Sequence, residues 1–302
     1  MTLLLQVRNL KVSFQDLHAV RGINFEVFEG ETLGIVGESG CGKTSALQAI
    51  AGLCSRATIG GSAYFEGVDL IRENREVLGK KIGVIFQDPM TALNPTMKVH
   101  AQIAEGMIYH GKATKEEARL RVLELLTLVG IPDVAAQYPH ALSGGQRQRV
   151  AIAIAIACNP KLLIADEPTT ALDVTTQGQI IRLIQEIQKQ QKMSVILISH
   201  DLGVVGQICD RILVFYAGKI VEQGKTRDIF QTPRHPYTQM LLAARPTMDH
   251  PKSEPLRAIE GTAPSLTRPI LGCSFAERCP YKMAICEKDP PFLGTSACWK
   301  NL

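Results

Sequence analysis

The chain has 302 residues, enough to bury a large core and to form two domains or one domain with additions. A hydrophobic content of 45% and a charged content of 21% are typical of a globular protein and exclude a disordered one. The net charge is only +4 and no lysine- or arginine-rich block is present, so we expect no nucleic-acid partner.

No apolar run reaches the about 18 residues of a membrane span. The apolar first residues have no basic start, so we do not expect a signal peptide. These features predict a cytosolic protein that could still sit on a membrane protein.

The first part of the chain predicts strands. Residues 3–14 place Leu10, Val12 and Phe14 on one face of an alternating pattern, which is typical of a half-buried strand. Residues 19–29 and 63–70 show similar patterns, so we expect an antiparallel layer. Phe14 is a candidate for stacking on an adenine ring, and a core position on the strand is the alternative.

A phosphate-binding loop follows the next strand. Residues 32–36 are a short apolar run, residues 37–44 read Gly-Glu-Ser-Gly-Cys-Gly-Lys-Thr, and residues 44–53 predict a helix. The loop matches the pattern G-x-x-x-x-G-K-[ST] in the strand–loop–helix context that it requires. Glycines let successive N–H groups turn toward phosphates. Lys43 would reach the β- and γ-phosphates and Thr44 would bind Mg²⁺, with a plain glycine-rich turn as the alternative.

The middle of the chain predicts a helical lobe. Residues 81–86 predict an apolar strand that ends at Gln87, and the pattern is helical from residue 96 to about residue 129. Thr114 with Glu117 three residues later is the signature of a capping box.

A second helix start lies at residues 142–146, Leu-Ser-Gly-Gly-Gln, before an apolar helix that runs to Cys158. Ser143 is the expected N-cap. The N–H groups and the positive dipole end of such a helix make a site for an anion. Taken alone, an ordinary capped helix is the alternative.

Two acids end the next predicted strand, residues 161–165. Carboxylates at the end of a parallel strand near a P-loop suit Mg²⁺ binding and water activation. We assign Asp166 to the metal side and Glu167 to the general base, with a solvated strand end as the alternative. His200 follows the predicted strand at residues 193–198 and is a candidate contact of the γ-phosphate, with a structural histidine as the alternative.

The last part of the chain has a different composition. Residues 211–218 and 219–224 predict a hairpin, and prolines concentrate after Phe230. Four cysteines lie in this tail: Cys273, Cys279, Cys286 and Cys298. In a reducing cytosol, clustered thiols indicate a metal site rather than disulfides.

The cysteines are separated by five, six and eleven residues, longer than the C-x₂₋₄-C pairs of most structural zinc sites. Longer gaps suit a larger cluster held by a wrapping loop, with zinc and free or oxidised thiols as alternatives.

The motifs occur in an order that resembles the ATP-binding subunit of an ABC transporter, over residues 1 to about 230: the P-loop, Gln87, Leu142 to Gln146, Asp166-Glu167, Asp173 and His200. Residues 86–95, 235–242 and 272–281 look like the oligopeptide/dipeptide/nickel importer branch and extend the resemblance through the C-terminus.

The resemblance implies an α/β fold with a P-loop NTPase (RecA-like) core, an antiparallel β layer, a helical subdomain at about residues 90–157 and a C-terminal cysteine-rich appendage. It divides the chain into a nucleotide-binding domain, residues 1–230, and a transporter-type tail, residues 231–302. At the four tail cysteines it implies a [4Fe–4S] cluster, for which we expect a structural role.

The implied activity is ATP hydrolysis with Mg²⁺, in a head-to-tail dimer with ATP at the interface. It would power the import of a dipeptide, oligopeptide or nickel chelate. Implied partners are a second ATP-binding subunit (self or homologue), two transmembrane permease subunits and an extracytoplasmic solute-binding protein. The chain would lie peripherally on the cytoplasmic face of the inner membrane.

The resemblance also implies site residues. Glu167, His200 and Gln87 would be catalytic, and Thr44 and Gln87 would contact Mg²⁺. The implied nucleotide contacts are Phe14, Gly37, Ser39, Gly40, Cys41, Gly42, Lys43, Thr44, Ser45, Gln87, Ser143, Gly144, Gly145, Gln146, Asp166 and Asp173.

Three other classes of function fit less well. Soluble ABC ATPases of DNA repair or translation usually carry a coiled-coil insertion or two cassettes, and this chain shows one cassette and no long heptad run. An ATPase of iron–sulfur assembly would not be expected to carry the tail. Glu167 and His200 argue against a non-catalytic regulator.

Overall fold

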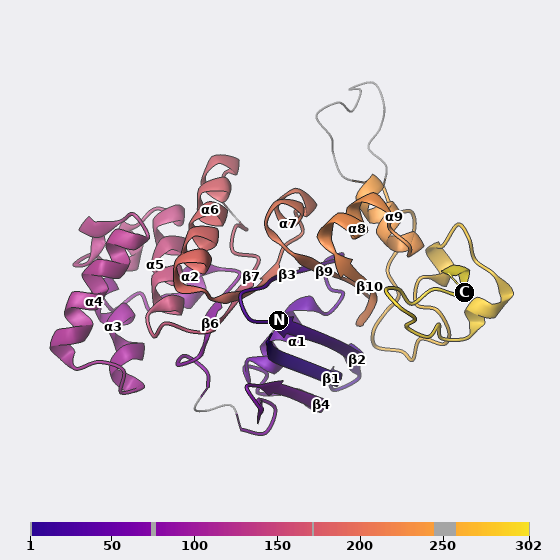
Figure 1. The fold of residues 1–302 in the computed structure, drawn as a ribbon, viewed down its shortest axis with the longest axis horizontal. Coiled ribbons are helices and arrows are strands. Elements are labelled where there is room, and N and C mark those ends of the chain that lie inside the picture. Colours follow the sequence, from indigo (N-terminus) through magenta and orange to yellow (C-terminus); the bar gives the residue numbers. More distant parts are fainter. Residues whose placement is uncertain (1, 74–76, 171, 245–257, 302) are drawn as a thin grey trace. The chain divides into compact units, whose positions relative to one another are not determined.

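The computed structural model describes residues 2–73, 77–170, 172–244 and 258–301 (Figure 1). The chain forms two compact units, each built from distant parts of the sequence. The first unit takes residues 1–4, 27–32 and 72–198, and the second takes residues 5–26, 33–71 and 199–302, within the described ranges. None of the helices in the described part of the chain is long and apolar enough to cross a membrane.

The second unit contains most of an antiparallel sheet with the order β2-β1-β4-β5. Its strands are β1 (Leu3–Phe14), β2 (Leu17–Phe28), β4 (Thr58–Phe65) and β5 (Val68–Asp69). The expected antiparallel layer is therefore present. The strand-and-turn pattern at residues 63–70 is a tight hairpin between β4 and β5, because Glu66 (φ 48°) and Gly67 (φ 84°) both adopt left-handed backbone conformations.

The strand before the P-loop is β3 (Thr32–Val36), and all of its residues are buried. β3 pairs in parallel with β9 (Arg211–Tyr216), and β9 pairs antiparallel with β10 (Lys219–Lys225), which confirms the predicted hairpin. Helix α1 (Lys43–Ile50) begins inside the P-loop motif. The second unit also contains α7 (Leu202–Ile208), α8 (Thr226–Gln231) and α9 (Pro236–Ala243).

The first unit contains parallel strands that position the acids. β7 (Leu162–Asp166) pairs with β6 (Ile82–Ile85) on one side and with β8 (Ser194–Ile198) on the other. Every residue of β7 and β8 is buried. Because the carboxyl ends of parallel strands meet at one edge of a sheet, the residues that follow β6 and β7 come close together.

Helices connect these strands along the chain. They are α2 (Pro89–Ala92), α3 (Val99–Tyr109), α4 (Lys115–Leu128), α5 (Gly144–Ile156) and α6 (Val174–Gln191), with 3₁₀ turns at Pro132–Val134 and Pro139–Ala141. The helical stretch expected from residue 96 to residue 129 is interrupted, because Gly111 (φ 62°) follows the end of α3. The predicted capping box then starts α4. The N–H of Glu117 donates to Thr114 Oγ1 at 3.3 Å and the N–H of Thr114 donates to Glu117 Oε2 at 2.7 Å.

The C-terminal segment, residues 258–301, consists of loops with 3₁₀ turns at Ala276–Arg278, Ala284–Glu287 and Trp299–Asn301 (Figure 1, yellow). It is attached to β10 by backbone hydrogen bonds of 2.8 Å from Ala297 to Val221 and from Gln223 to Thr295. Phe275 is 1% exposed and packs against the rings of Tyr216 and Tyr237. The segment lies in the same compact unit as the P-loop, so the structure does not support the predicted cysteine-rich appendage.

Candidate nucleotide site

The P-loop depends on glycines at two close backbone approaches. A Cβ added to Gly37 (φ 151°) would lie 2.3 Å from the carbonyl oxygen of Phe215, and one added to Gly42 (φ 102°) would lie 2.2 Å from that of Ala19. Any side chain at either position would therefore collide with backbone. The loop can form only with glycines here, which agrees with the reading of this stretch as a phosphate cradle.

Lys43 lies inside this cradle with 5% of its surface exposed. Its Nζ donates to the carbonyl oxygens of Gly37 at 2.8 Å and Glu38 at 2.9 Å. Burial raises the pKa of the neighbouring Cys41 thiol, which stays neutral and fills space beside the lysine. Thr44 and Ser45 follow on the first turn of α1, whose N-terminus is suited to an anion.

The first unit brings Gln87 and Glu167 together. Glu167 directly follows β7, and its Oε2 accepts a hydrogen bond from Gln87 Nε2 at 3.1 Å and another from Thr170 Oγ1 at 2.9 Å. Asp166, the last residue of β7, is 7% exposed. Sequence reasoning identified the two acids and the glutamine, but it missed Thr170, because nothing in the sequence Pro-Thr-Thr shows which hydroxyl turns back to the acid.

The signature stretch also forms in the first unit. Ser143 caps α5 through a capping box, in which the N–H of Gln146 donates to Ser143 Oγ at 3.2 Å and the N–H of Ser143 donates to Gln146 Oε1 at 2.9 Å. A Cβ added to Gly145 would lie 2.9 Å from Cγ2 of Thr176. The start of α5 therefore presents two residues without side chains, Gly144 and Gly145, at the positive end of a helix.

Asp173, a predicted nucleotide contact, is the N-cap of α6. Its carboxylate accepts from the N–H of Thr176 at 3.0 Å and from Thr176 Oγ1 at 2.6 Å. These hydrogen bonds, with the side-chain bond the larger cause, lower the pKa of Asp173, so this exposed carboxylate is charged at neutral pH. Thr176 connects the two motifs of the first unit, since it meets both Asp173 and the backbone position of Gly145.

Two profiles of known families match the chain. One, described as ABC transporter, covers residues 20–170, and the other, described as oligopeptide/dipeptide transporter, C-terminal region, covers residues 221–286. The chain belongs to the ABC transporter family. It is an ABC-type ATPase with the P-loop fold of that family.

Curated relatives match almost the whole chain. The chain is 52% identical to the oligopeptide transport ATP-binding protein OppD of Bacillus subtilis (strain 168), over 98% of this chain and 87% of that protein. It is 51% identical to the dipeptide transport ATP-binding protein DppD of the same organism, over 95% of this chain and 90% of that protein.

Solved ABC structures share the fold. The ATP-binding cassette MJ0796, in a dimeric post-hydrolysis state bound to ADP and Pi, matches with a TM-score of 0.66 and 30% identity, over 74% of this chain and 99% of that one. The cbiO1 protein from Clostridium perfringens, part of the cbiONQ ABC transporter complex, matches with a TM-score of 0.67 and 32% identity, over 77% of this chain and 92% of that one.

The other predicted residues of this ABC ATPase lie in the second unit. Phe14 is the last residue of β1 and is half-buried, while His200 is exposed between β8 and α7. Ser39 and Gly40 form the exposed tip of the P-loop. The predicted residues are thus divided between the units: Phe14, the P-loop residues and His200 belong to the second, and Gln87, the signature residues, the two acids and Asp173 belong to the first.

The prediction of an iron–sulfur cluster is wrong, and zinc is not supported either. The described residues contain no group of three or more histidine, cysteine, aspartate or glutamate side chains that could hold a metal ion. Cys273, Cys279, Cys286 and Cys298 are free cysteines. Burial raises the pKa of Cys273 to about 11, and it also raises the pKa of Cys279 and Cys298. The segment is held by aromatic packing and hydrogen bonds, which sequence spacing alone does not reveal.

ATP and Mg²⁺ fit the residues that are present. Gly37 and Gly42 give the P-loop a backbone path that no other residue could follow, and the buried Lys43 supplies a positive charge within that loop. The hydroxyl of Thr44, the amide of Gln87 and the carboxylate of Asp166 are oxygen donors of the kind that Mg²⁺ takes in proteins.

Proposed function

We propose that this chain binds and hydrolyses ATP to power an ABC importer of peptides or a related small solute: a dipeptide, an oligopeptide or a nickel chelate. The observation that carries the proposal is the near-complete match to proteins named for oligopeptide and dipeptide transport, at about half identity. The match of residues 221–286 to the transporter-type C-terminal region supports the same branch.

Each group of residues has a role in the nucleotide site. Lys43 and the P-loop N–H groups bind the phosphates, and Phe14 stacks on the adenine. The phosphate contacts are Gly37, Ser39, Gly40, Cys41, Gly42, Lys43, Thr44 and Ser45. Thr44, Gln87 and Asp166 would hold Mg²⁺, which when bound neutralises charge that develops on the phosphates.

Glu167 takes the proton of the attacking water, and His200 contacts the γ-phosphate. The hydrogen bonds from Gln87 and Thr170 hold the Glu167 carboxylate in one orientation, which supports its role as the base. Lys43 and Glu167 both serve the nucleotide that their own chain binds.

The signature residues serve a partner subunit. We assign Ser143, Gly144, Gly145, Gln146 and Asp173 to the nucleotide held by the P-loop of a second ATP-binding subunit, either a copy of this chain or a homologue. The capped start of α5 can receive an anion because its N–H groups and dipole carry positive charge. The dimeric cassette among the solved relatives supports this arrangement.

The remaining proposals concern organisation and partners. Residues 1–230 form the nucleotide-binding domain, with a helical subdomain at about residues 90–157, and residues 231–302 form the transporter-type tail. Two transmembrane permease subunits and an extracytoplasmic solute-binding protein complete the importer. The chain lies peripherally on the cytoplasmic face of the inner membrane.

Uptake in a strain that lacks this chain tests the transport proposal. We expect loss of uptake of labelled dipeptide, oligopeptide or nickel chelate, and recovery with the wild-type chain. Glu167→Gln should not restore uptake, whereas Glu186→Gln, a change at an exposed position on α6, should. Unchanged uptake of all three solutes in the deletion strain would contradict the proposal.

Purified protein tests the role of Glu167. Glu167→Gln should bind ATP like the wild type, because the P-loop holds the phosphates, and should hydrolyse it about 10²- to 10⁴-fold more slowly, the usual contribution of a general base. Phosphate release and equilibrium ATP binding measure the two effects, with Glu186→Gln as the control. Turnover within a few-fold of wild type would contradict this assignment.

A further inference from the structure

Glu38, the residue after Gly37, forms hydrogen bonds with both the C-terminal segment and α9. Arg278 of the C-terminal segment donates two parallel hydrogen bonds to its carboxylate, from Nη1 to Oε2 at 2.8 Å and from Nη2 to Oε1 at 2.9 Å. The N–H of Glu38 donates to the hydroxyl of Tyr237 on α9 at 2.9 Å. Its carbonyl oxygen accepts from Lys43 Nζ.

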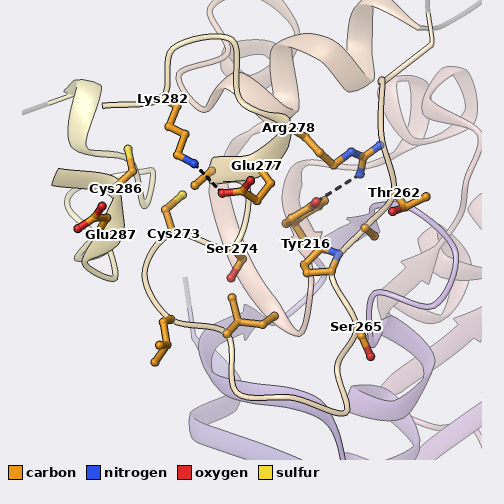
Figure 2. Close-up of a pocket in the computed structure, with 15 residues that line it drawn as sticks. Tyr216, Thr262, Ser265, Cys273, Ser274, Glu277, Arg278, Lys282, Cys286 and Glu287 are labelled. Atoms are coloured by element: carbon orange, nitrogen blue, oxygen red, sulfur yellow. Dashed lines mark hydrogen bonds and ion pairs between the residues drawn. The ribbon is translucent and has the colours of Figure 1, made fainter. Parts of the chain in front are cut away.

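Arg278 is itself fixed by the C-terminal segment. Its Nε donates to the carbonyl oxygen of Glu260 at 2.9 Å, Nη2 donates to that of Ile259 at 3.1 Å, and Nη1 donates to the Tyr216 hydroxyl at 3.3 Å. Figure 2 shows Arg278 beside Tyr216 at the wall of a cavity of about 440 Å³. The Arg278 side chain is 6% exposed, and its hydrogen bonds to Glu38 are the main cause of a raised guanidinium pKa.

Tyr237 is fixed by aromatic packing. Its ring centroid lies 4.6 Å from that of Tyr216 and 5.4 Å from that of Phe275, and the side chain is fully buried. Burial raises the pKa of Tyr237, so its hydroxyl is neutral at physiological pH. Arg278 and Tyr237 thus both contact Glu38, one residue of the P-loop.

We propose that Arg278 and Tyr237 are positioning residues for ATP binding, which act through Glu38. The inference rests on the proposed ATP site. Two physical reasons support it. Glu38 is the only acid in the P-loop, and an unpaired carboxylate there would repel the phosphates of ATP. Lys43 Nζ donates to the carbonyl oxygens of Gly37 and Glu38 and would turn from them to the phosphates when ATP binds. The orientation of these two peptide groups therefore sets the position of the lysine side chain before ATP binds.

A positioning role predicts a change in the KM for ATP rather than in the chemical step. Arg278→Gln in the full chain should raise the KM and the Kd for ATP about tenfold, because the two charge-assisted hydrogen bonds to Glu38 are lost. The kcat should stay within about two-fold of wild type, since Glu167 and its partners are untouched. Arg278→Lys should recover part of the affinity, because lysine restores the positive charge but cannot form the two parallel hydrogen bonds.

Lys282→Gln is the matched control. This lysine pairs with the exposed Glu277 in the same segment, so its loss should leave the KM unchanged. Tyr237→Phe provides a second variant that keeps the ring packing. It removes only the acceptor of the Glu38 N–H and should raise the KM about threefold with little change in Tm.

A double-mutant cycle shows whether Glu38 carries the effect. Arg278→Gln should change the KM much less when Glu38 is already Gln. If neither Arg278→Gln nor Tyr237→Phe raises the KM for ATP, the proposal is overturned, whether or not Tm falls. Effects of Arg278→Gln and Glu38→Gln that simply add would overturn it as well. Lys43→Ala that binds ATP like wild type would instead overturn the ATP site on which the inference rests.

Discussion

Glu167 combines an unusual backbone with a fixed side chain. Its φ of 46° lies in the left-handed region that residues other than glycine seldom adopt. The carboxylate is held by Gln87 and Thr170, and its N–H donates to the carbonyl oxygen of Ile198 at 3.1 Å. Strained, over-determined residues of this kind cluster at functional sites, which agrees with the proposed role of Glu167 as the base.

The hydroxyl of Thr170 provides a test of this fixation. Thr170→Val keeps the shape of the side chain but removes the hydrogen bond to Glu167, so kcat should fall about tenfold while ATP affinity is retained. Thr127→Val on α4 is the control, because Thr127 Oγ1 donates only to the nearby carbonyl oxygen of Leu123. Steady-state phosphate release measures both variants. An equal loss in the two variants, or a loss of ATP binding in Thr170→Val, would argue against a role through Glu167.

Residues joined by short stretches of chain were easier to predict than residues joined by long ones. The spacing of Gly37, Gly42 and Lys43 is local, so the cradle could be read from the sequence. Arg278 lies 240 residues after Glu38, and no pattern in either stretch connects them. The same limit applies to the cysteines, where four thiols clustered in the tail were taken as a sign of a shared metal cluster and the structure shows free cysteines.

At the scale of elements, helix starts were well predicted because their chemistry is local. Thr114 with Glu117 and Ser143 with Gln146 both form the complete capping box. The capping box at Thr114 implied a new helix start, but the position where the preceding helix ends, at Gly111, was not predicted, because apolar residues continue with helical spacing on both sides of it. A single glycine in such a pattern is compatible with either a helix end or an interior position.

Helix α5 allows its cap to be separated from its proposed role at the partner's nucleotide. Ser143→Ala should destabilise the protein by about 1 kcal/mol, because the N–H of Gln146 loses its acceptor. Ser143→Asn should keep that stability, since asparagine caps as well as serine, yet it should slow hydrolysis because its larger side chain blocks the partner's phosphates. Denaturant midpoints and ATPase rates test this pair. Full activity in Ser143→Asn would contradict the contact.

Helix α9 begins at a buried histidine that predicts a pH dependence. Burial lowers the pKa of His235 to about 4, and its neutral Nδ1 accepts the N–H of Tyr237 at 3.1 Å. The buried Glu222 accepts the backbone N–H groups of Arg234 and His235 at 2.7 and 2.9 Å. In the unfolded chain the pKa of histidine is about 6.5, so below this pH the unfolded state binds a proton that the folded state does not.

The free energy of unfolding should therefore fall as the pH falls from about 6.5 toward about 4, by about 2 kcal/mol at pH 5. Above about pH 6.5 this loss is absent. His235→Asn keeps an N-cap acceptor but does not titrate, so its stability should fall less over the same range. Urea unfolding at about pH 7.5 and about pH 5 gives the comparison. Equal pH slopes in the two proteins would contradict a role for His235.

At the scale of the whole molecule, the sequence predicted the class of fold better than the arrangement of its C-terminal part. Buried strands such as β3 and β7 show as continuous apolar runs, and the P-loop shows as a motif, so the core could be predicted. The proline-rich segment has few periodic residues, and it is ordered by Phe275 and Tyr237, which lie 38 positions apart along the chain. Contacts of this kind depend on three-dimensional packing and leave no local pattern.

The proposed dimer makes a further prediction about whole molecules. If ATP lies between the P-loop of one chain and the signature of another, Lys43→Ala and Ser143→Arg disable different halves of each site. Each variant alone should be inactive, because both sites of its homodimer contain a defect. In a mixed dimer, the intact P-loop of the Ser143→Arg chain faces the intact signature of the Lys43→Ala chain, so one site is complete.

An equimolar mixture of these variants should recover about a quarter of the wild-type ATPase rate, because random pairing gives half mixed dimers with one working site of two. A mixture of Lys43→Ala with Glu167→Gln is the matched control and should stay inactive, since both residues serve the nucleotide of their own chain. The rate per subunit should also rise with protein concentration. Failure of the first mixture to recover activity, with dimers present by size-exclusion chromatography, would contradict a shared site.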